Sequence, residues 1–158
     1  MSYYALTTEW DVAAPLAQVW TALMAAERWP AWWTGLQGVI ELVPGMSGLV
    51  GCVRRFTWKG RLPYTLTMDL RVMRIEPPRL LEGLATGDVE GVGRWELEEQ
   101  PGGTHVRCTW RVRTTKRWMR WLDPVARRAF VWNHDAVMQA GGRGLKQLLE
   151  RSPQPATA

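Results

Sequence analysis

The sequence predicts an α+β fold in which a curved antiparallel sheet wraps around one long C-terminal helix. Three observations predict it. The chain opens with a strand-like segment, continues with about 75 residues of β-type alternation, and closes with a helical pattern from Pro124 to about Glu150. A helix of some 27 residues is a rod of roughly 40 Å, and a strongly twisted antiparallel sheet offers the apolar surface that it needs.

The first strand alternates clearly between an apolar and a polar face. Tyr4, Leu6, Thr8, Trp10 and Val12 share one parity, as expected of a half-buried strand.

Two short helices are expected after the first strand. Pro15 suits a first helical position, and Leu16, Val19 and Leu23 recur at helical spacing. The segment 29–36 predicts a second short helix, because Pro30 would disrupt a longer one.

About six further strands fill the middle of the chain, separated by turns rich in glycine and proline. They are expected at 39–43, 49–58, 61–78, 79–86, 91–100 and 104–114. Apolar residues such as Trp95 and Trp110 alternate with Glu96, Glu98, Arg107, Arg111 and Arg113, which we expect to pair across strands on the outer face of the sheet.

The last helix has one apolar side. Asp123 and Pro124 predict its N-cap and first position, after a separate helical turn at 117–122. At 100° per residue, the residues within about 40° of Phe130 are Met119, Ala126, His134, Val137, Gly141 and Leu148, with Asn133 and Leu145 near 60°. Arg128, Trp132, Asp135, Gln139 and Arg143 lie on the opposite side.

Composition excludes several classes of protein. The chain of 158 residues is 46% apolar and 22% charged, which is ordinary globular usage, and it contains eleven tryptophans, which suit large cores and apolar cavities. A secretory signal and a run of about 20 apolar residues are both absent, so we expect a cytoplasmic protein without integral membrane association. Cys52 and Cys108 stand far apart and predict neither a metal site nor a disulfide framework.

The order of elements and several phrases resemble the START/Bet v1-like (SRPBCC) superfamily, and within it the polyketide cyclase/dehydrase-type branch. The matching phrases are "WDVAAPLAQVWTALMAAERWPAWWTGLQGV", "IEPPRLLEGLATGDVEGVGRWELEE", "GGTHVRCTWRV" and "WNHDAVMQAGGRGLKQLL". The resemblance implies a helix-grip fold, with a seven-stranded sheet around the last helix and an internal cavity for lipids, sterols, polyketides or plant hormones. It implies one such domain over residues 1–151, and we expect 152–158 to form a disordered tail.

Candidate site residues are the apolar and polar side chains that these patterns direct inward. The ligand-binding candidates are Tyr64, Leu66, Met68, Trp95, Trp110, Phe130, Asn133, His134, Val137 and Gly141. His134 and Tyr64 are the candidates for proton transfer, since histidine titrates near neutrality and a tyrosine hydroxyl can form hydrogen bonds within an apolar site. The alternative for both is structural: His134 is hydrogen-bonded to a strand backbone or to a side chain, and Tyr64 lies in the core with its hydroxyl at the rim.

Arg54 and Glu82 leave two interpretations open. Arg54 shares the parity of Val50, Cys52 and Phe56, so it is either turned outward by a strand-end bulge, which we favour, or directed inward, where an Arg54–Glu82 pair is an alternative.

Two functions follow as hypotheses. The first is binding of a small apolar or aromatic, lipid- or polyketide-like molecule in the cavity; the alternative is a polyketide cyclase, aromatase or dehydratase that uses polar cavity residues. No motif predicts a cofactor or metal. The charge of +5 is spread over several faces, so we expect no nucleic-acid partner, while the oligomeric state stays open.

Overall fold

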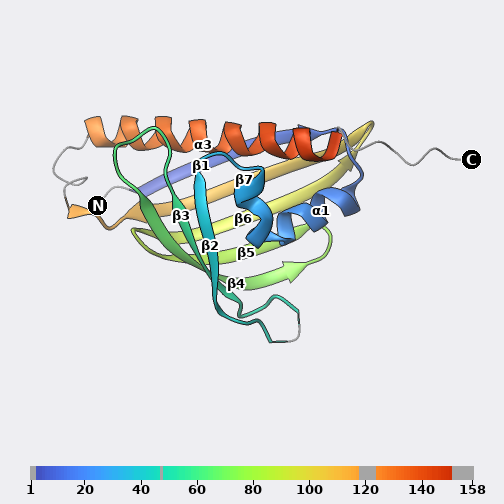
Figure 1. The fold of residues 1–158 in the computed structure, drawn as a ribbon, viewed down its shortest axis with the longest axis horizontal. Coiled ribbons are helices and arrows are strands. Elements are labelled where there is room, and N and C mark those ends of the chain that lie inside the picture. Colours follow the sequence, from blue (N-terminus) through green and yellow to red (C-terminus); the bar gives the residue numbers. More distant parts are fainter. Residues whose placement is uncertain (1–2, 47, 118–123, 151–158) are drawn as a thin grey trace, which may run out of the picture.

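A seven-stranded antiparallel sheet curves around the C-terminal helix α3, with α1 at one end of the sheet (Figure 1). The computed structural model describes residues 3–46, 48–117 and 124–150. Its elements are β1 (Tyr3–Val12), α1 (Leu16–Met24), the 3₁₀ helix η1 (Ala26–Ala31), β2 (Leu36–Val43), β3 (Val53–Trp58), β4 (Leu66–Glu76), β5 (Leu80–Gly87), β6 (Val89–Gln100), β7 (Gly103–Thr114) and α3 (Val125–Glu150). The predicted α+β helix-grip arrangement is confirmed.

The strand order is β1-β7-β6-β5-β4-β3-β2. From β2 to β7 each strand pairs with the next along the chain, as short turns require, while β1 pairs with β7 at the far edge. The segment α1–η1 therefore connects the two edges of the sheet. This connection places η1 against β2 and opposite the middle of the sheet.

The main core lies between the sheet, α1, η1 and α3. Val19 and Leu23 of α1, Trp33 after η1 and Leu145 of α3 are almost completely buried in it. A second cluster surrounds Phe130 near the start of α3, where Tyr4, Leu6, Val89, Val112 and Ala126 pack together. Each cluster joins α3 to the sheet, so the helix is fixed at both ends.

Several boundaries differ from the predicted ones. Pro15 is the N-cap of α1 rather than its first residue, and the second short helix is a 3₁₀ helix at 26–31, which accommodates Pro30 in its last turn. β3 begins at Val53 and β6 begins at Val89, so the only residue between β5 and β6 is Asp88. The predicted helical turn at 117–122 beyond its first residue, the Asp123 cap and the tail at 152–158 lie outside the described residues.

The outer face of the sheet carries cross-strand ion pairs, but their partners differ from the predicted ones, and Glu96 pairs with Arg94 of its own strand. Arg107 pairs with Glu9 of β1 at 3.0 Å, Arg113 with Glu90 of β6 at 2.7 Å, and Arg94 with Glu82 of β5 at 3.2 Å. His105 also joins this surface, because it lies between Asp11 and Glu9, with its Nδ1 2.8 Å from Asp11 Oδ1.

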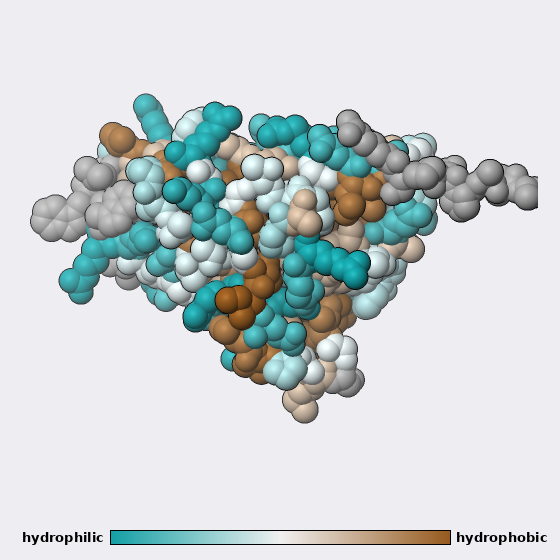
Figure 2. Space-filling model, viewed as in Figure 1, coloured by the Kyte–Doolittle hydropathy of each residue, from teal (hydrophilic) through white to brown (hydrophobic). Residues whose placement is uncertain are grey.

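Apolar side chains are also exposed at the edge strand β2, and Figure 2 shows this surface running down the middle of the view. Ile40, Leu42 and Val43 are its members on the strand. None of the described helices is long and apolar enough to cross a membrane.

Candidate ligand-binding site

A cavity of about 100 Å³ lies between the sheet and α3. Strands β1, β3, β4, β6 and β7 form its floor, η1 and Trp33 close one side, and α3 closes the top. Its lining is almost entirely apolar: Leu6, Trp29, Trp33, Trp58, Leu66, Met68, Leu70, Val89, Trp95, Trp110, Val112, Phe130, Asn133, His134, Val137 and Met138. A cavity of this composition is suited to an apolar guest.

Trp33 holds the tryptophan wall in place. Its indole Nε1 donates a 2.8 Å hydrogen bond to the Val137 carbonyl of α3, and its ring lies 5.1 Å, between centroids, from both Trp29 and Trp58. Trp29 donates from its own Nε1 to the Ala22 carbonyl at 3.2 Å. Aromatic rings fixed in this way present flat walls that do not need to reorganise around a planar ligand.

His134 is the titratable residue of the cavity. Its side chain is 14% exposed, and its Nδ1 lies 3.4 Å from Asp135 Oδ1. The other ring nitrogen, Nε2, is buried and has no hydrogen-bond partner among the described residues. Burial lowers the pKa of His134 from its ordinary value, and Asp135 only partly opposes this shift, so the ring is neutral at pH 7.

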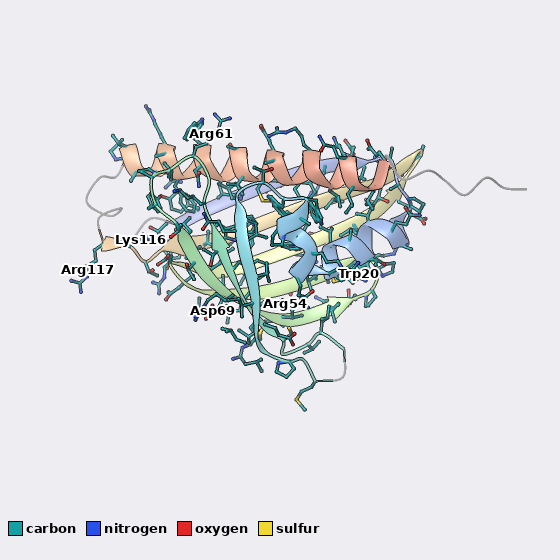
Figure 3. All side chains as sticks on the ribbon, viewed as in Figure 1. Trp20, Arg54, Arg61, Asp69, Lys116 and Arg117 are labelled. Carbon is teal, nitrogen blue, oxygen red and sulfur yellow. The ribbon has the colours of Figure 1, made fainter. Side chains whose placement is uncertain are left out.

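Asn133 ties the cavity to the β3–β4 loop. It is buried, and its Oδ1 accepts a 2.8 Å hydrogen bond from the backbone N–H of Arg61. Gly60 admits this contact, because a Cβ there would collide with Asn133 Oδ1. The Arg61 guanidinium lies over the Trp132 ring on the outer side of α3, beside the helix in Figure 3. The loop at 59–65 is thereby held against the helix.

A second cavity, of about 50 Å³, lies further from α3. It shares Trp29, Leu70, Trp95 and Trp110 with the first, so these four side chains divide one apolar interior into two compartments.

Arg54 lines the second cavity, and the bulge interpretation that turned it outward is wrong. Its side chain is 12% exposed and pairs with Glu27 of η1 at 2.7 Å, at the end of β3 away from Arg61 (Figure 3). In the pairing of β2 with β3, the register irregularities fall on β2 instead, between Leu36 and Gly38 and between Glu41 and Val43. The Arg54–Glu82 pair does not form, because Glu82 lies on the outer face with Arg94.

Two predicted site residues lie elsewhere. Tyr64 precedes β4 and packs in the Phe130 cluster, with Lys116 Nζ 5.4 Å from its ring centroid, and burial raises the pKa of its hydroxyl. Gly141 faces the Trp33 ring, which fills the space that a side chain would need. Neither is among the described residues that line the cavity; the other eight candidates are.

Sequence reasoning missed several lining residues. Leu70 and Trp58 could have been found, since Leu70 has the parity of Leu66 and Met68, and Trp58 that of Phe56. Trp29 and Trp33 reach the cavity only because η1 folds over the sheet, which no local pattern reveals.

The next features concern metal binding and the two cysteine thiols of the described residues. Within residues 3–46, 48–117 and 124–150, no three His, Cys, Asp or Glu side chains are grouped to hold a metal ion. Cys52 and Cys108 are free and buried, and desolvation raises the pKa of each thiol.

Comparison with known proteins gives the family. Structures with the same fold include the Zhui aromatase/cyclase from Streptomyces sp. R1128, at 18% identity and a TM-score of 0.80 over 99% of both chains. The di-domain ARO/CYC BexL from the BE-7585A biosynthetic pathway has 19% identity and a TM-score of 0.74, and the match covers 96% of this chain and 51% of that one. TTHA0849 from Thermus thermophilus has 13% identity and a TM-score of 0.74, and the match covers 92% of this chain and 99% of that one.

These identities show the fold alone. No curated protein matches the sequence. The family model described as "Polyketide cyclase / dehydrase and lipid transport" matches residues 5–150, nearly the whole chain. The chain therefore belongs to the polyketide cyclase/dehydrase and lipid transport family.

Proposed function

We propose that the protein binds a small, flat, apolar or aromatic molecule in the cavity beneath α3. The observation that carries this proposal is the wall of five tryptophans, Trp29, Trp33, Trp58, Trp95 and Trp110, around an apolar space closed by the helix. Burial of an aromatic ring there removes apolar surface from water at about 25 cal/mol per Å².

The size of the cavity limits its ligand. A space of about 100 Å³ is below the roughly 300–1,000 Å³ of pockets for drug-sized molecules and suits a single ring. A longer ligand would displace the dividing side chains, Leu70 among them, and extend toward Arg54 in the second compartment.

A matched pair of substitutions tests the binding proposal. Val112→Phe fills the cavity, whereas Val92→Phe makes the same change on an exposed position of the neighbouring strand β6. With toluene as the probe, calorimetric or ligand-observed NMR titration should show binding to the parent protein and to Val92→Phe, and loss of binding in Val112→Phe. Equal binding by the two variants, or no binding by the parent protein, would contradict the proposal.

Cyclase, aromatase or dehydratase activity is the second candidate, favoured by the neutral His134 in the cavity. A neutral imidazole can remove a proton from an enolisable carbon, and the cation of Arg54 in the second compartment could stabilise a negatively charged oxygen.

Product analysis by mass spectrometry tests this candidate with a poly-β-keto thioester as the probe. Turnover should be lost in His134→Phe with the fold retained, and kept in Tyr64→Phe, since Tyr64 lies outside the cavity lining. Absence of a cyclised product from the parent protein would leave binding as its function.

A further inference from the structure

Two residues that line the cavity each carry a buried polar atom without a partner among the described residues: Nε1 of Trp58 and Nε2 of His134. Both residues line the same cavity of about 100 Å³. The indoles of Trp29 and Trp33 differ in this respect, because each donates to a backbone carbonyl. An unpaired buried polar atom costs about 1–3 kcal/mol, so two at one apolar site call for an explanation.

The two atoms have opposite hydrogen-bonding roles. An indole Nε1–H can only donate. His134 is neutral and carries its proton on Nδ1, because the nearby Asp135 carboxylate can only accept, and this leaves Nε2 as an acceptor. The residues that line the cavity therefore offer one donor and one acceptor in an otherwise apolar surface. A hydroxyl group can donate and accept through a single oxygen atom.

We propose that the ligand carries a hydroxyl group on its ring, which donates to Nε2 of His134 and accepts from Nε1 of Trp58. The chemical class is a phenol or a ring enol, which share this O–H. The proposal rests on the proposed function, because it specifies which aromatic molecule enters the same cavity.

Phenol and toluene provide a matched pair of probes, since they differ only by hydroxyl against methyl. A purely apolar cavity prefers toluene, because an unpaired hydroxyl loses its hydrogen bonds to water. In the parent protein we expect phenol to bind at least as tightly as toluene. In Trp58→Phe and in His134→Phe the dissociation constant of phenol should rise about tenfold or more relative to that of toluene. Trp132→Phe, the same change on the exposed side of α3, should leave the ratio unchanged.

The outcomes separate the two proposals. Binding of toluene with phenol weaker by tenfold or more in the parent protein would overturn the hydroxyl proposal and leave apolar binding intact. Binding of neither probe would overturn both.

If a variant does not fold, the parent protein still decides the question by NMR. The indole N–H signal of Trp58 should move downfield with phenol but not with toluene. Equal shifts with the two probes would overturn the hydroxyl proposal.

Discussion

Asn133 illustrates how a single polar side chain can hold a loop beside an apolar cavity. Its Oδ1 accepts the backbone N–H of Arg61, and it is 7% exposed, so water cannot replace the bond. A side chain of similar volume without an acceptor would leave that N–H unpaired.

Substitution of Asn133 should therefore destabilise the protein. We expect Asn133→Leu to lower the free energy of unfolding in urea by about 1–3 kcal/mol. Arg61→Ala is the control: it keeps the backbone N–H and loses only the exposed contact with Trp132, worth about 1 kcal/mol or less. Equal losses in the two variants would contradict a role for the Asn133 bond.

His134 should make stability depend on pH. Its pKa in the folded protein lies below the ordinary value of 6.5, so as pH falls below about 6.5 the unfolded chain takes up a proton first and stability decreases. His105 acts in the opposite direction, because Asp11 and Glu9 raise its pKa and proton uptake then favours the folded protein.

Comparison with His134→Phe isolates this effect, since both proteins retain His105. Urea unfolding between pH 5 and 8 should show the parent protein losing stability relative to the variant as pH falls. A difference that is constant over this range would contradict a buried, neutral His134.

Among the elements, α3 has glycines where tryptophan rings pack closely against the helix. A Cβ at Gly141 would lie 2.6 Å from Cζ2 of Trp33, and one at Gly142 would lie 2.8 Å from Nε1 of Trp10. Trp33 is almost fully buried and hydrogen-bonded, so its ring cannot move aside.

Gly141→Ala should therefore reverse the usual effect of this substitution in a helix. Alanine normally stabilises a helix by about 1 kcal/mol relative to glycine. Here overpacking should instead lower the free energy of unfolding by about 1–3 kcal/mol. Gly38→Ala, where a Cβ meets nothing within 4 Å, is the control and should cause no such loss. Stabilisation by Gly141→Ala in thermal or urea unfolding would contradict this packing.

The elements also show what the sequence can and cannot predict. Alternation with a period of two residues predicts β6 and β7. The helical periodicity of 100° per residue predicts that Phe130, Asn133 and Val137 face inward. Both predictions follow directly from the geometry of the element concerned. The inward placement of Leu148 is wrong: it is 44% exposed, whereas Met138 and Gly142 are buried. The buried face of α3 shifts around the helix axis toward its C-terminus, because the sheet passes beneath the helix at an angle. A prediction that measures every residue from Phe130 cannot include this shift.

Across the whole molecule, several arginines lie in local ion pairs. Despite a net charge of +5, Arg55, Arg74, Arg94, Arg107 and Arg113 each contact a carboxylate. Such pairing reduces the phosphate contacts that a nucleic acid could make.

We therefore still predict no nucleic-acid partner. Fluorescence polarisation with a labelled duplex of about 20 base pairs should show no saturable binding at about 150 mM salt. Binding that weakens steeply between about 50 and 200 mM salt would contradict this, since that dependence measures phosphate contacts.

The interior, by contrast, is organised around a space. The sheet, η1 and α3 each contribute tryptophan or polar side chains to one cavity, and the hydrogen bonds of Trp33 and Asn133 hold the walls around it. A crystal structure of the protein soaked with toluene tests this most directly. We expect density for one ring between Trp58, Val112 and His134. Density only on the outer surface, or an unchanged cavity at saturating toluene, would contradict it.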